Sequence, residues 1–126
     1  MQTHRYKPSA STKRIGIFGG TFDPVHLGHV GSAEALLEQQ GLDELYFMPC
    51  QRHPHDKRPM ANSEQRLAML TLALQKQSSL KVDDRELSRL GKSFTVDSLT
   101  EIRQEIGEQT TLIFLLGSDA FAQGLP

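Results

Sequence analysis

Residues 15 to 29 constrain the fold of this 126-residue chain more than any other stretch. A short apolar run, Ile15 to Phe18, leads into Gly19 and Gly20, and a Thr-Phe-Asp-Pro segment follows them. This order predicts a strand, a tight loop and a helix that begins near His26. Such an arrangement can hold phosphate, because glycines let the main chain approach a ligand and the first N–H groups of a helix have no partner within it.

His26 and His29 follow the loop at a spacing of three residues, which places both imidazoles on one face of the first helical turn. From that face both rings can donate hydrogen bonds to one anion, and such bonds strengthen as negative charge builds during phosphoryl displacement. A His-x-x-His pair is also half of a zinc site, but no third ligand follows at a recognisable spacing. The plainer alternative is that both are ordinary polar residues at a helix start. We predict that both histidines act on phosphate and that the chain has no dedicated metal ligands.

Short apolar segments alternate with helical patterns along the rest of the chain. Continuous apolar strands separated by helices are typical of a parallel sheet covered on both faces. We therefore predict an α/β fold, a doubly wound, Rossmann-like parallel sheet of about four strands. A strand order of 3-2-1-4 would place Gly19 and Gly20 across a cleft from residues 117–119. The expected strands are 15–18, 45–48, 80–82 and 111–116, and the expected apolar helix faces are Val30, Ala33, Leu36 and Leu37, then Leu67, Leu70, Ala73 and Leu74, then Val96, Leu99, Ile102 and Ile106.

Composition narrows the classes of partner. The chain has 14 basic and 15 acidic side chains, so any anion site must be local, and neither nucleic acid nor a membrane is an expected partner. The longest apolar run, residues 112–116, is too short to cross a bilayer, and one cysteine, Cys50, fits a reducing compartment, so we expect a cytoplasmic protein. Residues 1–14 show no periodicity, and we expect a flexible tail before a domain of residues 15–126.

The segment from Gly19 to His29 resembles the His-x-Gly-His signature of the nucleotidyltransferase superfamily, and its wording is most similar to bacterial nicotinate-nucleotide adenylyltransferases. The resemblance extends from Arg14 to Pro126. It implies an enzyme of NAD biosynthesis that transfers AMP from ATP to nicotinate mononucleotide, giving deamido-NAD and pyrophosphate, with Mg²⁺ carried by the ATP. The resemblance and the loop together assign catalysis to His26 and His29, and ATP phosphate binding to Gly19, Gly20, Thr21, Phe22 and Gly28, with Thr21 and Phe22 acting more through main-chain N–H groups than through side chains.

Residues 53–58 resemble a loop of the family in which Pro-Pro-His and a basic residue cover the substrates. Here His53 replaces the first proline, and Asp56 stands where the base is expected. The resemblance therefore points to His55, Lys57 and Arg58 as phosphate ligands. The alternative is an ordinary solvated loop of charged residues.

Two further segments resemble parts of the family that bind the mononucleotide. Ser93, Phe94 and Thr95 match a Ser-Tyr-Thr segment that recognises the pyridine ring and its carboxylate, although Phe94 lacks the tyrosine hydroxyl. The alternative makes Phe94 a core residue and Thr95 a helix cap. Gly117 and Asp119 match a contact to sugar and phosphate. Arg66 either supports the phosphate site or lies on the surface of a helix.

Relatives continue to an Ile-Ser-x-Thr-x-x-Arg motif that grips the ATP phosphates, and this motif is missing from the 126 residues. We therefore expect a chain that lacks the C-terminal part of the family and that alone binds nucleotide weakly. Two alternatives stay open. The chain is another nucleotidyltransferase, such as a phosphopantetheine adenylyltransferase, or a non-catalytic nucleotide-binding fragment. The sequence leaves the oligomeric state open, a homo-oligomer included.

Overall fold

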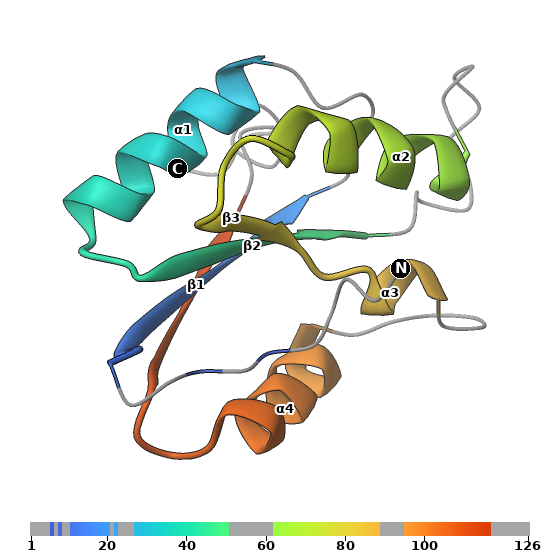
Figure 1. Ribbon diagram of the computed structural model, residues 1–126. Helices are drawn as coiled ribbons and strands as arrows, with labels where there is room; N and C mark the ends of the chain where they lie inside the picture. Colours follow the sequence, from blue (N-terminus) through green and yellow to red (C-terminus); the bar gives the residue numbers. More distant parts are fainter. Residues whose placement is uncertain are drawn as a thin grey trace, which may run out of the picture.

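The computed structural model describes residues 6, 8, 11–20, 22, 27–50, 62–88 and 95–116. Among these residues, helices and strands alternate for most of the chain (Figure 1). None of the helices in these ranges combines the length and the apolarity needed to cross a bilayer. The elements are β1 (Arg14–Gly20), α1 (Leu27–Gln39), β2 (Glu44–Pro49), α2 (Ser63–Leu74), β3 (Leu80–Val82), α3 (Arg85–Ser88), α4 (Thr95–Ile106) and β4 (Thr111–Leu116).

The four described strands form one parallel sheet in the order β3-β2-β1-β4. Ile15 of β1 pairs with Glu44 of β2 and with Leu112 of β4, so β1 lies in the interior of the sheet. Helices α1 and α2 cover one face and α4 covers the other (Figure 1). The predicted doubly wound fold and its strand order are confirmed. The winding reverses between β1 and β4, whose carboxyl ends lie at the same edge.

The face under α1 and α2 is apolar. Side chains alternate along a strand, so Phe18 of β1 and Phe47 of β2 share this face, and Leu70 and Leu74 of α2 pack against them. Leu70 is fully buried. Leu67, predicted on the same stripe, is partly buried, whereas the predicted Ala73 is exposed.

The opposite face contains Ile15, Ile17 and Tyr46, which pack against Ile102 of α4. Tyr6 also belongs to this core, since its side chain is buried and its ring centroid lies 4.0 Å from that of Tyr46. The expectation of a flexible tail is therefore wrong at Tyr6. It is also wrong at its last residue, because β1 begins at Arg14.

The ends of the helices are capped by polar side chains and by glycines. Asn62 accepts from the main-chain N–H of Gln65, whose side chain accepts from the Asn62 N–H in return, so α2 begins with a capping box. After α1, Gly41 adopts φ +60°, and the Leu42 N–H bonds the Leu37 carbonyl at 2.9 Å, as in a Schellman motif. A second glycine at positive φ, Gly107, follows α4.

Two features of the face of the sheet under α4 differ from what the sequence pattern predicts. Val96, predicted on the inner face of α4, is 68% exposed, and Ser98 is fully buried instead. The charged stretch directly after β3 contains the short helix α3, which is not among the helices expected from the sequence. Both differences have the same cause, because side chains of α3 bond to α4 through charged and hydroxyl groups rather than through apolar ones.

Candidate functional site

Gly19 and Gly20 form the carboxyl end of β1, where ligands bind in doubly wound sheets. Gly19 pairs with Met48 on one side and Leu116 on the other. The Gly20 carbonyl accepts a hydrogen bond from the Cys50 N–H at 2.9 Å, directly after β2. Both glycines therefore lie between neighbouring strands at the edge where the winding direction reverses.

Packing gives both glycines a second reason to lack a side chain. A Cβ at Gly19 would lie 3.1 Å from the ring of Phe114, and one at Gly20 would lie 3.1 Å from the ring of Phe22. These separations are tighter than ordinary van der Waals contact. Glycine is therefore favoured at both positions by the neighbouring aromatic rings, whether or not a ligand approaches the main chain there.

Phe22 follows β1 and packs into the core. Its φ of 50° lies in the left-handed region, which is costly for a non-glycine residue. The side chain is 1% exposed, and its ring lies 5.5 Å from Phe18 and 5.1 Å from Phe47, measured between centroids. The Phe22 side chain is therefore part of the core, and the role of its main chain toward phosphate stays a prediction.

His29 lies in the first turn of α1, and its ring packs edge-on against Phe22 at a centroid distance of 5.1 Å and an angle of 89°. The side chain is 1% exposed. The structure therefore brings His29 together with Phe22 beside the glycine end of β1. The role of this imidazole toward phosphate stays a prediction.

Arg66 is buried in the first turn of α2 and links this helix to Cys50, the residue directly after β2. Its Nη1 donates to the Cys50 carbonyl at 2.7 Å, and its Nη2 donates to the Ser63 hydroxyl at 3.3 Å. Because the Cys50 N–H donates to Gly20, the guanidinium is linked through one residue to the glycine end of β1. The helix-surface alternative for Arg66 is wrong. Its spacing of four from Leu70 is the sequence signal that places it on the buried face of α2.

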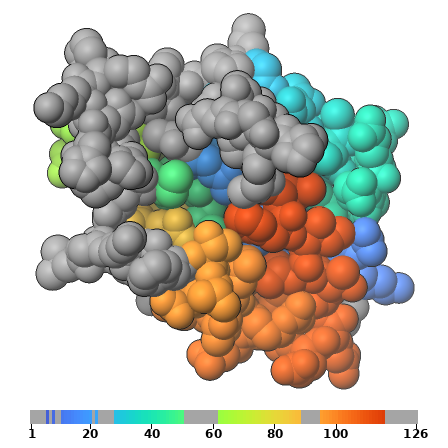
Figure 2. All heavy atoms as spheres, turned by 180° about the vertical axis from the view of Figure 1, so that it is seen from behind, coloured from blue at the N-terminus to red at the C-terminus, as the bar shows by residue number. Residues whose placement is uncertain are grey.

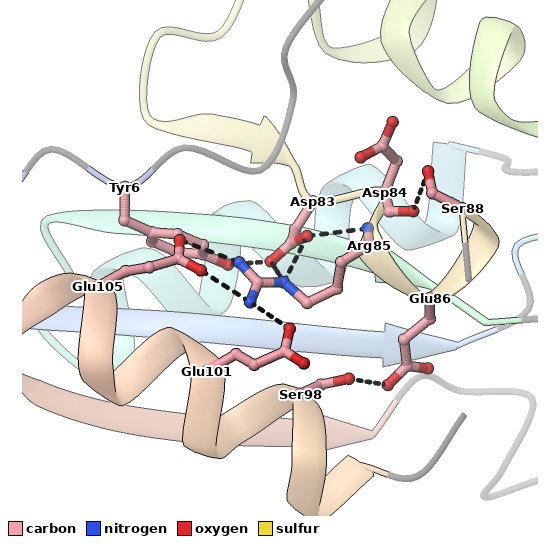
Figure 3. A network of polar contacts seen from close by, with 9 residues as sticks. All are labelled: Tyr6, Asp83, Asp84, Arg85, Glu86, Ser88, Ser98, Glu101 and Glu105. Carbon is pink, nitrogen blue, oxygen red and sulfur yellow. Dashed lines mark hydrogen bonds and ion pairs between the residues drawn. The ribbon is translucent and has the colours of Figure 1, made fainter. Parts of the chain in front are cut away.

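A second polar cluster lies on the other face of the sheet, between β3, α3 and α4 (Figure 3). Asp83 is fully buried and accepts from the Tyr6 hydroxyl at 2.7 Å and from Arg85 Nε at 2.9 Å. Arg85 is 5% exposed and also donates to Glu101 at 3.2 Å and to Glu105 at 3.1 Å. Each buried charge is therefore paired, as low-dielectric surroundings require.

The pairing changes the proton affinity of the groups in the cluster. Burial raises the pKa of Tyr6 far above its usual value, and the neighbouring Asp83 carboxylate raises this pKa further. Burial alone would lower the pKa of Arg85, but hydrogen bonds to Glu105 and Asp83 outweigh it and raise that pKa. The phenol of Tyr6 thus stays neutral and the guanidinium of Arg85 stays charged.

Next to this cluster, Ser98 Oγ donates to Glu86 Oε2 at 2.7 Å, and both side chains are buried. Sequence reasoning missed Asp83, Arg85, Glu86 and Ser98. The sequence did contain one signal. Leu80 and Val82 of β3 face α2, and because side chains alternate along an extended chain, the next residue, Asp83, faces the opposite side, where Tyr6 lies.

The predicted site residues divide by what the structure describes. Gly19, Gly20, Phe22 and His29 come together at the end of β1. Gly28 is an exposed residue in the first turn of α1, and Thr95 is the exposed first residue of α4. Within the described ranges, no three His, Cys, Asp or Glu residues are grouped to hold a metal ion. The predicted residues outside these ranges are Thr21, His26, His55, Lys57, Arg58, Ser93, Phe94, Gly117 and Asp119.

A doubly wound parallel sheet with two glycines at the carboxyl end of an interior strand is typical of nucleotide-binding proteins. The sequence model of the cytidylyltransferase-like proteins matches residues 17–124, and the chain belongs to this family. The predicted superfamily is thus confirmed.

Curated relatives narrow the resemblance. The chain is 49% identical over 108 residues to a probable nicotinate-nucleotide adenylyltransferase of Cellvibrio japonicus, which covers 86% of this chain and 51% of the relative. It is also 49% identical over 114 residues to a probable nicotinate-nucleotide adenylyltransferase of Pseudomonas aeruginosa. This match covers 90% of this chain and 53% of the relative. The predicted resemblance is confirmed by these relatives. The chain spans about half the length of the curated relatives it matches.

A solved structure supports the fold. Nicotinic acid mononucleotide adenylyltransferase of Plasmodium falciparum, complexed with NaAD, superimposes with a TM-score of 0.63 over 88% of this chain and 55% of that chain. The sequence identity is 22%, so this likeness speaks for the fold.

Proposed function

We propose that this chain acts in the transfer of AMP from ATP to nicotinate mononucleotide, which forms deamido-NAD and pyrophosphate in NAD biosynthesis. One observation supports this most. The strand-loop-helix segment that resembles the nucleotidyltransferase signature lies at the carboxyl end of an interior strand, in a chain 49% identical to nicotinate-nucleotide adenylyltransferases. In a doubly wound sheet this is the edge at which a nucleotide binds.

In the proposed reaction, a phosphate oxygen of the mononucleotide attacks the α-phosphorus of ATP in line. The new P–O bond replaces the bond to the bridging oxygen of the β-phosphate, which leaves with pyrophosphate. No side chain needs to become covalent, so catalysis consists of positioning and charge stabilisation. Mg²⁺ enters with the ATP and neutralises phosphate charge.

The residues have separate tasks in this reaction. His26 and His29 donate hydrogen bonds as charge builds on the phosphoryl oxygens, while main-chain groups from Gly19 to Phe22 and at Gly28 bind ATP phosphate. His55, Lys57 and Arg58 add donors and positive charge. Ser93, Phe94, Thr95, Gly117 and Asp119 bind the mononucleotide. A cytoplasmic location and the formation of homo-oligomers stay predictions.

Pyrophosphate release tests the proposal. This chain and a version extended to the length of its relatives are each given ATP with nicotinate mononucleotide, and parallel reactions contain its amide or phosphopantetheine instead. We expect the extended version to form pyrophosphate and dinucleotide one for one with a mononucleotide. If phosphopantetheine is the only acceptor that gives pyrophosphate, the chain belongs to a different nucleotidyltransferase. If both versions bind nucleotide without turnover, the chain is a binding module.

A further inference from the structure

The hydrogen bond between Ser98 and Glu86 joins α3 directly to the start of α4 (Figure 3). Ser98 is fully buried, Glu86 is 5% exposed, and the donor and acceptor oxygens are 2.7 Å apart. Ser98 lies three residues after Thr95, the first residue of α4. A short, buried bond to a carboxylate is directional, so it fixes the place of this helical turn more tightly than apolar contact alone.

Arg85 provides a second connection further along the same helix. Its guanidinium bonds Glu101 and Glu105, which lie one turn apart on α4, and it is held in turn by Asp83 at the end of β3. Together the two connections tie the start and the later turns of α4 to the residues that follow β3. The helix therefore has a defined position relative to the sheet.

The start of α4 lies at the edge of the sheet where β1 ends. Helix α4 leads through residues 107–110 into the beginning of β4, so its last turn is near the amino ends of the strands and its first turn is near their carboxyl ends (Figure 1). Thr95 is thus at the same edge as Gly19 and Gly20. Glu86 and Ser98 flank the connection between α3 and α4.

We propose that Ser98 and Glu86 are positioning residues for the mononucleotide, with Arg85 in support. They hold the first turn of α4, and hence Thr95, where it can recognise a pyridine nucleotide that bears a carboxylate. This inference rests on the proposed function, in which Thr95 contacts the mononucleotide. A displacement of about 1 Å can cost a hundredfold in a positioned reaction, so the loss of one anchoring bond has room to act.

The effect on the two substrates separates positioning from simple stabilisation. ATP is expected at the glycine end of β1 and at α1, whereas the hydrogen bond between Ser98 and Glu86 joins α3 to α4. A positioning role therefore weakens mononucleotide binding and leaves ATP binding unchanged. A purely structural role lowers the melting temperature and weakens both ligands together.

Ser98→Ala in the 126-residue chain is the first test, because it removes one hydroxyl with little change in volume. Dissociation constants for nicotinate mononucleotide and for ATP are measured separately by NMR titration, which suits weak binding, and the melting temperature is recorded for each variant. Thr100→Ala is the matched control, since Thr100 lies on the same helix and its exposed hydroxyl donates to the Val96 carbonyl of that helix. Glu86→Gln keeps an acceptor oxygen of the same reach, whereas Glu86→Ala removes it.

We expect Ser98→Ala and Glu86→Ala to weaken mononucleotide binding by about tenfold, with ATP binding unchanged, and the double variant to be no worse than either single variant. Glu86→Gln and Thr100→Ala should bind like the wild type. Unchanged mononucleotide binding in Ser98→Ala, or an equal loss for both ligands, would overturn the inference while leaving the proposed function intact. Failure of the extended version to bind any pyridine mononucleotide while it still binds ATP would instead remove the proposed function, and the inference with it.

Discussion

The two faces of the sheet are held to their helices in different ways. Under α1 and α2 the contacts are apolar, with Phe18, Phe47 and Leu70 at the centre. Under α4 the apolar contacts are joined by a buried charge cluster built on Asp83 and Arg85. The first face is stabilised by removing area from water, whereas the second also depends on each charge keeping its partner.

This difference matters at the carboxyl edge of the sheet, where both faces end. The apolar face contributes Phe22 and His29, whose rings pack against each other. The polar face fixes the start of α4 through Glu86 and Ser98. Seen from behind, α4 and β4 form a continuous surface, with α1 on the far side of β4 (Figure 2). Near this edge, Phe22 and His29 are thus held by contact between aromatic rings, whereas Glu86 and Ser98 are held by a buried hydrogen bond.

The largest effect should come from Asp83→Ala. The change leaves the buried Arg85 guanidinium and the Tyr6 hydroxyl without their shared acceptor, and breaking such a buried pair costs about 3–5 kcal/mol. Urea unfolding of the variant measures the loss. Lys81→Ala is the control, because Lys81 is 44% exposed in its pair with Glu44 and a surface pair contributes about 1 kcal/mol or less. Equal losses for the two variants would show that the cluster adds no more than a surface pair.

Leu70→Ala tests the apolar face. Leu70 is fully buried between α2 and the sheet, and deleting such a side chain costs about 2–5 kcal/mol through lost burial and the cavity that remains. Unfolding in urea gives the value, with Leu72→Ala as the control on the same helix, since Leu72 is 65% exposed. The comparison between the faces breaks down if Leu70→Ala is nearly neutral.

His29→Ala tests the proposed chemistry of the apolar face in the extended version of the protein. Loss of one donor to developing charge lowers turnover by about a hundred- to a thousandfold, equivalent to about 2.7–4 kcal/mol. The variant also loses the ring contact to Phe22, so Leu37→Ala, which removes packing from the same helix, serves as the control. Near-normal turnover in His29→Ala, or an equal drop in Leu37→Ala, would remove His29 from the mechanism.

The smallest effect concerns proton binding on the polar face. The chain has two tyrosines, and burial raises the pKa of both, with Asp83 adding to the effect at Tyr6 and Glu44 at Tyr46. Because their folded pKa values exceed the unfolded value of about 10, the associated stability is complete below about pH 10 and is lost as pH rises above it. Alkaline titration followed by tyrosinate absorbance should show ionisation only as the chain unfolds. Ionisation of either ring in the folded chain near pH 10 would contradict its burial.

Local patterns were enough to predict most of the fold. Apolar strands separated by helices predicted the parallel sheet and its order. The same patterns failed on the polar face. Tyr6 bonds a carboxylate 77 positions away, and no local periodicity can reveal a pairing at that distance.

Local chemistry also located part of the candidate site. The loop after β1 identified Gly19, Gly20 and His29 from local chemistry, and the structure brings them to one edge. The buried role of Arg66 was not recognised, although the residue falls on the stripe of Leu70. A charged residue on an apolar stripe is read as surface unless a buried acceptor is known, and that acceptor, the Cys50 carbonyl, is a tertiary contact.

A crystal structure of the chain with a non-hydrolysable ATP analogue tests the central claim most directly. Our account predicts the phosphates at the carboxyl end of β1, within hydrogen-bond distance of main-chain groups between Gly19 and Phe22, with the His29 imidazole toward them. A nucleotide bound elsewhere on the chain, or one at this edge with His29 facing away from the phosphates, would contradict it.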